Sequence, residues 1–402
     1  MIPFYAWLVL AGPLWSIAGG ISVPRRYRAR RADPRLARLA GGLGGAALGP
    51  LALVPLWLAV PRVRRGVHVL APGLLLVAEF VWFFALANPA NPCATSGAYL
   101  ANQIQNGLTV GILYATMSVG LTLIYSVQRI ISFCHGQFVM FGGVVAFVLL
   151  EYFDWNPLFA VPIVALASFA FGTVVARGLL KPVAAGTVDR PDEYALLITF
   201  GFGLFLTYAL IGMLGAPVAI RTPRYTDRPL FGLDTAVVQA GIFNLRVDLL
   251  VAGGIGLVAF VLTAILLYRT WLGRSLRAVS MDRDAAAVVG IDAGRAFVYA
   301  FGIGTLLAGV AGAALVPAFN FQVPEMASQT AIRSYVIVVL GGLGSVGGAV
   351  LGGLALGVAE ALTAACYPDP SKGATYQAAA GLLMFLTVLL VRPQGFFGRA
   401  ET

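Results

Sequence analysis

The side chains that most often carry metal or redox chemistry are scarce in this chain, which holds three cysteines and two histidines in 402 residues. Cys93, Cys134 and Cys366 show no Cys-x-x-Cys spacing, so neither a zinc site nor a disulfide framework is predicted. Cys134 lies in an apolar run, where cysteine usually serves as a small buried hydrophobic residue. A disulfide between Cys93 and Cys366, on the oxidising face of a membrane, is an open alternative.

A glycine motif follows the apolar run 336–340, in the spacing Gly-x-Gly-x-x-Gly: Gly342, Gly344 and Gly347. A dinucleotide-binding loop would need a βαβ unit and an acidic residue about 20 positions on. Here Glu360 follows 13 positions after Gly347, within one membrane-length run. Glycines repeat every four residues, which favours close helix packing, or a broken helix beside a transport pathway: Gly344, Gly348 and Gly352.

Residue sets for ATP hydrolysis and other catalysis are missing from the sequence. No Gly-x-x-x-x-Gly-Lys-Ser/Thr loop occurs, and the two lysines, Lys181 and Lys372, follow no such glycines. A His-Glu-x-x-His pair, a catalytic triad and a metal-ligand cluster are missing too. We therefore expect no catalytic residues, no bound metal and no cofactor, so that any ATP is hydrolysed by partner subunits.

Polar residues inside apolar runs are candidates for a translocation pathway, because polar groups in a bilayer usually face a protein interior or water. His135 and Gln137 stand in one such run, and Asn106 lies near the start of another. A histidine satisfied by a backbone carbonyl, and an asparagine that caps a helix or bonds at the interface, are the alternatives. Glu79 and Glu360 are expected at membrane interfaces rather than in transport.

The most informative polar stretch is 270–298, which alternates arginines and aspartates: Arg274, Arg277, Arg283 and Arg295 with Asp282, Asp284 and Asp292. Apolar residues recur there at nearly helical spacing: Leu276, Val279, Ala286, Val289 and Ile291. A short amphipathic helix ending near Gly290 is predicted, because glycine is favoured just past a helix end. A solvated connector is the alternative, but the apolar side would need a partner surface to cover it.

Long uncharged runs surround these residues and decide the fold class. Hydrophobic residues make up 59% of the chain and charged residues 11%, against about a quarter in soluble domains. The runs are too long for buried strands and lack the alternation of a membrane barrel. We predict an all-α polytopic integral membrane protein with about ten to twelve membrane segments. The uncharged runs are 1–24, 39–61, 80–128, 130–150, 155–176, 194–220, 249–268, 296–324, 334–359 and 373–391.

Arginine placement gives the orientation of part of the chain, whose net charge is +10. Residues 1–22 lack a preceding base and are followed by seven arginines, as in an uncleaved anchor with its N-terminus outside. Contact with anionic lipid explains these arginines more simply than a nucleic-acid-binding arm. Later bases place the 269–295 loop in the cytoplasm. Two ambiguities stay open. Residues 39–61 either cross the membrane or form a re-entrant segment. Residues 334–366 form either one broken segment or two short passes, and this choice decides the side of the membrane on which the C-terminus lies.

Five motifs carry a resemblance to a known family, the permease subunits of branched-chain amino-acid ABC importers. The stretch 270–298 resembles the family's coupling segment through Gly273, Arg274, Arg277, Ala285, Ala286 and Gly290. The other motifs follow the family's order: NGLTVGILYATMSVGLTLIYSV (106–127), ISFCHGQFVMFGG (131–143), VVLGGLGSVGGAVLGGLALGVAEAL (338–362) and RPQGFFG (392–398). Together they span roughly 101–398.

The resemblance implies an ABC importer permease fold for 101–402, with the coupling loop 269–295 docked on an ATP-binding subunit. The implied coupling residues are Arg274, Arg277, Asp282, Ala286, Val289, Gly290 and Ile291. Implied partners are a second permease subunit, identical or not, two ATP-binding subunits and an extracytoplasmic solute-binding protein, in a bacterial plasma (inner) membrane.

Two features depart from the family. Residues 1–100, an N-terminal extension with two or three hydrophobic segments, have no counterpart. Ser132, Phe133 and Cys134 stand where relatives commonly have Asn, Phe and Ala, which bears on the substrate.

Several functions stay in competition. Branched-chain amino acids are the first expectation for the solute, followed by urea or short amides and other small carboxylates. A secondary transporter or channel, working without an ATPase, would place ionisable groups in broken helices, and acids are rare in these runs. An intramembrane enzyme would need more than His135 as its catalytic set.

Overall fold

The computed structural model describes residues 92–215, 219–220, 223–227, 237–240, 243–319, 321–367, 370–391 and 394–398. The chain separates into two compact units, Met1–Leu100 with Leu362–Pro393, and Ala101–Ala361 with Gln394–Thr402. The predicted segments at 1–24 and 39–61, and Glu79, lie outside the described residues. The second unit contains the helices discussed next.

Seven helices among the described residues are long and apolar enough to cross a membrane. Each coincides with an uncharged run of the sequence, which confirms the all-α polytopic membrane class. They are α8 (Gly97–Gln128), α9 (His135–Tyr152), α10 (Pro157–Gly178), α12 (Pro191–Leu214), α13 (Val247–Arg269), α16 (Ala293–Ala318) and α18 (Val346–Cys366).

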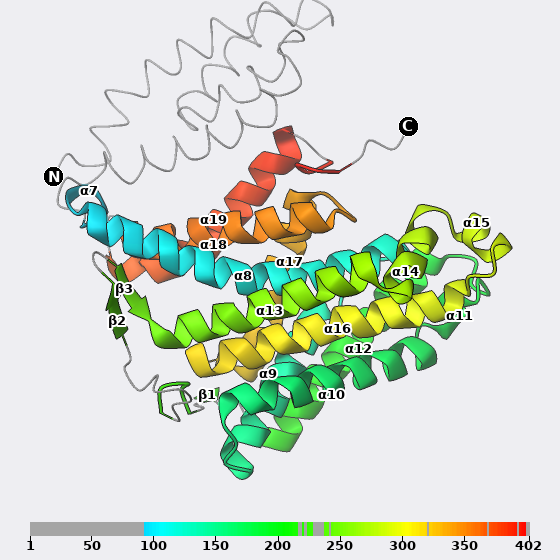
Figure 1. Cartoon of the computed structure of the whole chain (residues 1–402), viewed down its shortest axis with the longest axis horizontal. Helices are drawn as coiled ribbons and strands as arrows, with labels where there is room; N and C mark the ends of the chain where they lie inside the picture. The colour runs from blue at the N-terminus through cyan, green and yellow to red at the C-terminus, as the bar shows by residue number, and fades with distance from the viewer. Residues whose placement is uncertain are drawn as a thin grey trace, which may run out of the picture. The chain divides into compact units, whose positions relative to one another are not determined.

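Helices α8 and α16 form the centre of the second unit. In each of these two helices, 83% of the most apolar stretch of 18 residues is buried. Figure 1 shows α16 beside α13 and α10. Glycines let the two backbones meet: a Cβ on Gly120 would collide with the carbonyl of Gly304. Because lipid provides no hydrophobic force that joins helices, such close packing is a main source of their association.

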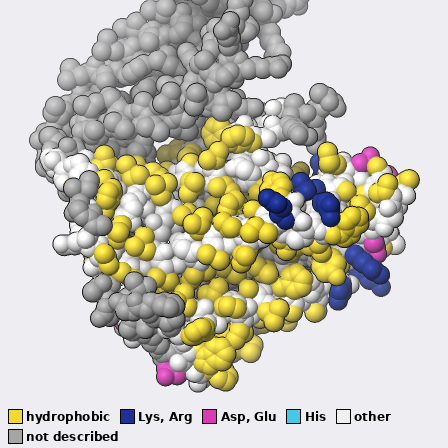
Figure 2. Space-filling view, in the orientation of Figure 1, with side chains coloured by type: hydrophobic (Ala, Val, Ile, Leu, Met, Phe, Trp, Pro, Cys, Tyr) yellow, Lys and Arg dark blue, Asp and Glu magenta, His cyan; other side chains and the backbone are white. Residues whose placement is uncertain are grey.

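Helices α10, α12 and α13 lie at the perimeter, since only 33%, 22% and 28% of their windows is buried. Large apolar side chains project from them, among them Leu166, Phe205 and Leu262, which are 71%, 68% and 61% exposed. Figure 2 shows a largely hydrophobic face, with Lys and Arg side chains gathered at the end where α14 and α15 lie. Such a surface suits lipid rather than water.

Two ends of the unit can be told apart by their connections. The basic end holds Arg129, α11 (Lys181–Ala184), α14 (Trp271–Met281) and α15 (Arg283–Val288). Arg129 donates to the carbonyl of Ser280, and Arg283 donates to that of Ala184. Arg129, the short helix that contains Lys181, and the bases of the 269–295 loop therefore share one end of the second unit.

The opposite end carries short antiparallel strands. Strand β2 (Val237–Ala240) pairs with β3 (Phe243–Arg246), and β1 (Ala219–Ile220) pairs with β4 (Phe321–Gln322). The side chain of Asn102 accepts a 2.6 Å hydrogen bond from the backbone N–H of Asn244, which ties the hairpin to α8.

The ambiguous stretch 334–366 forms two helices, α17 (Val323–Gly341) and α18, joined by a turn at 342–345. Gly342 and Gly344 have positive φ angles in this turn, so the Gly-x-Gly-x-x-Gly motif lies between two helices and is no dinucleotide loop. Phe396 and Phe397 donate to the carbonyls of Leu340 and Gly341. The turn faces Tyr125 near the end of α8, so 394–398 lies at the basic end.

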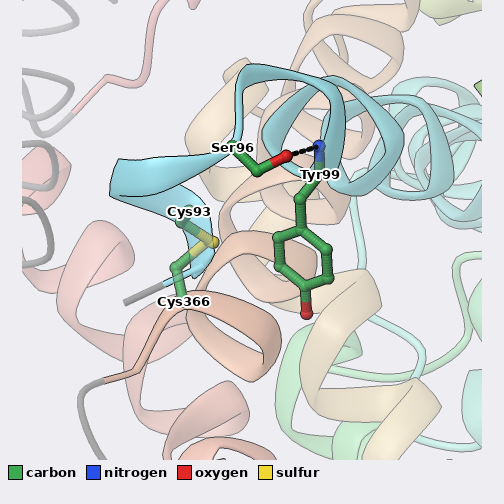
Figure 3. Close-up of a disulfide and its surroundings, with 4 residues drawn as sticks. All are labelled: Cys93, Ser96, Tyr99 and Cys366. Atoms are coloured by element: carbon green, nitrogen blue, oxygen red, sulfur yellow. Dashed lines mark hydrogen bonds between the residues drawn. A yellow bond between two sulfur atoms is a disulfide. The ribbon is translucent and has the colours of Figure 1, made fainter. Parts of the chain in front are cut away.

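The described part of the first unit contains a disulfide between Cys93 of α7 (Pro92–Thr95) and Cys366, at a Cα–Cα distance of 5.5 Å (Figure 3). This is the bridge that the sequence left open. Beside it, Ser96 accepts a hydrogen bond from the backbone N–H of Tyr99. Helix α19 (Pro370–Val391) follows, and Tyr367 stacks on Tyr376 with ring centroids 4.6 Å apart.

Candidate functional site

The coupling segment, residues 269–295, contains two helices where the sequence predicted one. Thr270 caps α14 by accepting from the backbone N–H of Gly273. Asp282 then leaves the helical conformation, with φ −152°, and its Oδ1 accepts 2.9 Å hydrogen bonds from the N–H groups of Asp284 and Ala285. An aspartate cap of this kind starts a new helix, so Asp282 divides the segment.

The predicted end near Gly290 is confirmed. The N–H of Gly290 donates to the carbonyl of Ala287, and the N–H of Ile291 donates to that of Ala286. These paired bonds, with φ +82° at Gly290, form a Schellman motif, which satisfies the last helical carbonyls. Asp292 then caps α16, because its Oδ1 accepts a hydrogen bond from the backbone N–H of Arg295. Its Oδ2 also lies 3.1 Å from Nε of the Arg295 guanidinium, which makes an ion pair.

The apolar side of the segment packs mostly on this chain. Leu276, Val279 and Ala286 are at most 5% exposed, and Ile291 is partly buried against them. Their partners come from three spanning helices: Leu123 and Val127 of α8, Leu267 of α13, and Ala296, Ala300 and Ile303 of α16. The apolar side therefore has the partner surface that the sequence analysis expected, and for these residues the chain's own helices supply it.

A second set of apolar residues on the coupling segment is exposed. Trp271, Met281, Val288 and Val289 are 71%, 80%, 87% and 73% exposed, and of these only Val289 was singled out from sequence. Arg274 and Arg277 stack over the rings of Trp271 and Tyr268, with their guanidinium carbons 5.2 and 5.1 Å from the ring centroids. These contacts hold both arginines at the surface in fixed positions.

His135 begins α9 inside the bundle. Its Nε2 donates a 2.8 Å hydrogen bond to the carbonyl of Met117, and the side chain is 0% exposed. Met117 precedes the end of α8 by 11 residues, so α9 starts about 16 Å short of the basic end. This contact matches the alternative of a histidine satisfied by a carbonyl; Nδ1 has no partner among the described residues, and a pathway role stays a prediction.

The other pathway candidates are not brought together. Asn106 and Gln137 have buried side-chain oxygens without a hydrogen-bond partner in the described part of the chain. Gly344 lies in the turn before α18, and a Cβ on Gly348 would collide with the carbonyl of Gly341. The packing interpretation of Gly348 therefore fits the structure, while roles of these residues in transport stay predictions.

A polar cluster between helices was missed from the sequence: Tyr114, Glu325, Gln329, Arg333 and Glu360. Arg333 Nε donates to both carboxylate oxygens of Glu360, at 2.9 and 3.1 Å, and Tyr114 Oη donates to Oε2 at 2.8 Å. The side chains of Arg333 and Glu360 are 14% and 3% exposed. Glu360 is thus buried and paired, while its expected place at a membrane interface stays a prediction.

The signal that could have revealed this cluster is the spacing Glu325, Gln329, Arg333. Residues four apart lie on one face of a helix. The uncharged run begins only at 334, after Arg333, so it covers only the second part of α17, which begins at Val323.

The fold and these sites define a polytopic membrane protein, with a folded segment at its basic end and a buried ion pair between two of its helices. The family model described as "Branched-chain amino acid transport system / permease component" matches residues 103–391. The chain belongs to this family.

Proteins of similar sequence agree with this family. The high-affinity branched-chain amino acid transport system permease protein BraD of Pseudomonas aeruginosa is 33% identical, over 74% of this chain and 96% of its own length. LivH of Escherichia coli, a permease protein of the same kind of system, is 29% identical, over 75% of this chain and 97% of its own length. LivM of the same species is 26% identical, over 63% of this chain and 62% of its own length. No solved structure matches the chain.

Proposed function

We propose that this chain is the membrane permease subunit of an ATP-driven importer of branched-chain amino acids in a bacterial plasma membrane. It pairs with a second permease subunit, two ATP-binding subunits bind beneath residues 269–295, and a solute-binding protein delivers the solute at the opposite end. Relatives named for branched-chain amino acids support this solute over urea, short amides or other carboxylates. ATP is hydrolysed by the partners, because the sequence lacks a phosphate-binding loop.

The observation that carries the proposal is the two-sided coupling segment. Its inner side packs on α8, α13 and α16, while its outer side exposes Met281, Val288 and Val289 at the basic end. Apolar residues at the water-facing end of a membrane protein mark a binding surface for another protein. A partner that closes there can displace three spanning helices through Leu276, Val279 and Ala286.

The energetics of such coupling require a difference between two states. The ATP-binding subunits drive import only if they bind one conformation of the permease more tightly than the other. The capped and packed helices α14 and α15 supply a firm surface for that purpose, in place of a flexible loop.

Co-purification tests the proposal. The complex is expressed with its partner subunits, and Val288→Glu/Val289→Glu is compared with Val237→Glu/Val238→Glu, which alters an exposed pair at the opposite end. We expect the first variant to lose the ATP-binding subunits and the second to keep them. A wild-type chain that retains no ATP-binding subunit yet transports solute would instead establish a secondary transporter or channel.

A further inference from the structure

A ladder of polar side chains runs along one face of α17 into the protein. Gln329 Nε2 donates to Glu325 Oε1, and Arg333 Nη1 donates to Gln329 Oε1 at 3.0 Å. Arg333 then reaches Glu360 of α18, which Tyr114 of α8 also contacts. From Glu325 to Arg333 the helix rises about 12 Å, so the ladder joins an exposed end to a buried carboxylate.

Helix packing does not account for this cluster. Helices α8 and α18 already meet through glycines, since a Cβ on Gly107 would lie 2.7 Å from the Cα of Val358, and one on Gly111 would lie 2.9 Å from that of Leu354. Replacing a buried ion pair by apolar residues is often neutral or stabilising. Charges inside membrane segments are costly and usually mark the path of a solute or ion.

The face of α17 that carries the ladder is open in the described part of the chain. Glu325 and Ser328 are exposed, Gln329 is partly exposed, and Ile332 is 51% exposed. Hydrocarbon cannot satisfy a carboxylate, an amide and a guanidinium, so we expect this face to border a water-filled path. A solute in that path reaches Arg333 along hydrogen-bonding side chains.

We propose that Arg333 and Glu360 bind the two charged ends of an amino-acid zwitterion during its passage, an inference that rests on the proposed import function. Arg333 takes the α-carboxylate in the two-bond geometry that guanidinium groups form with carboxylates. Glu360 takes the α-ammonium group and keeps the hydroxyl of Tyr114 as a donor. Before the solute arrives, the two residues neutralise each other.

Charge balance favours a zwitterion over other small solutes. When a zwitterion binds, the single ion pair between Arg333 and Glu360 is replaced by two ion pairs with the solute. No charge is then left without a counter-charge. A lone carboxylate or a lone amine would leave one unit of charge in the cluster without a counter-charge, which is costly at this depth. The cluster therefore selects for solutes that carry both charges, and urea does not gain from it.

Uptake of radiolabelled L-leucine by the complete complex in proteoliposomes tests this assignment. The variants are Arg333→Gln, Glu360→Gln and their combination, each confirmed by co-purification with the partner subunits. If the pair only stabilises the fold, removing both charges together restores uptake, because neither charge is left alone. We expect the double variant to stay at least about tenfold below wild type, since both solute contacts are lost.

A second variant covers the case in which the neutral forms fail to assemble. Arg333→Lys/Glu360→Asp keeps both charges and changes their reach, so we expect the KM for L-leucine to rise several-fold. An unchanged KM would overturn the assignment. Arg190→Gln/Glu193→Gln, which removes an exposed ion pair, is the matched control and keeps wild-type uptake.

The two proposals fail in different ways. A wild-type complex that imports no amino acid overturns the import function and the zwitterion assignment together. A wild-type complex that imports L-leucine, beside a double variant that imports it equally well, overturns the zwitterion assignment alone.

Discussion

The guanidinium of Arg129 donates a hydrogen bond to the backbone carbonyl of Ser280, at an Nη2–O distance of 3.1 Å. Arg129 follows the last residue of α8, and Ser280 lies in the last turn of α14. The bond therefore connects the end of α8, one of the two most buried spanning helices, to the coupling segment, in addition to the apolar packing beneath it.

Arg129 itself has a φ of 59°, a conformation that costs about 1–2 kcal/mol in residues other than glycine. Arg129→Ala and Arg129→Gly both lose the bond to Ser280, but only glycine relieves the backbone. We expect both variants to import less solute per ATP hydrolysed, and the glycine variant to melt at a higher temperature than the alanine variant. Equal melting temperatures in thermal unfolding would show that the conformation carries no strain.

The cap at Asp282 can be tested by hydrogen exchange. Asp282→Ala removes the acceptor for two N–H groups of α15, which costs about 1 kcal/mol of local stability. The backbone amides of 283–288 should then exchange several-fold faster, measured by mass spectrometry of the intact complex. Asp282→Ser should keep most of the protection, and Asp284→Ala, whose side chain caps no helix, is the control. Unchanged exchange in the alanine variant would contradict the capping role.

The bond between Cys93 and Cys366 closes a loop across 273 residues. Cross-links of this kind stabilise proteins by about 2–4 kcal/mol, chiefly by restricting the unfolded chain. We expect Cys93→Ser, Cys366→Ser and the double variant to lower the melting temperature equally, since any of them removes the same bond. Reducing agent should lower the melting temperature of the wild type but not that of these three variants. Cys134, buried and free, serves as the control: Cys134→Ser should keep the response to reducing agent.

Glycine packing predicts opposite effects at two positions. In Gly120→Ala the added methyl group meets the backbone of Gly304, so α8 and α16 must separate and the melting temperature should fall. Gly201 of α12 has no atom within 4 Å of an added Cβ. Gly201→Ala should keep or raise the melting temperature, because alanine is about 1 kcal/mol better than glycine in a helix. A change in melting temperature of the same sign in both variants would argue against close packing at Gly120.

Much of the bundle can be predicted from hydropathy, because each uncharged run has to form a helix in lipid. Helix α17 is the exception. Glu325 and Arg333 interrupt its apolar pattern, so α17 is not among the seven helices apolar enough to cross a membrane, and Arg333 meets Glu360 on the next helix. A contact between residues 27 positions apart is set by tertiary packing, which a local pattern does not record.

The coupling segment shows the same limit on a smaller scale. The spacing of Leu276, Val279 and Ala286 correctly predicts an apolar side, and Gly290 correctly predicts a helix end. Periodicity gives no direction in space, however, so it could not tell that this side faces the chain's own helices while Met281 and Val288 face outward. The sequence does contain a signal for the cap at Asp282, because an aspartate directly before a short helical stretch is a common helix start.

The pairing of Arg333 with Glu360 also constrains how the protein enters its membrane during synthesis. A helix with an arginine near its middle inserts poorly alone, at a cost of about 2.5–3.5 kcal/mol for that residue. Its counter-charge emerges from the ribosome only after the turn at 342–345. Helices α17 and α18 should therefore leave the insertion channel as one hairpin, with α17 held back until Glu360 has been made.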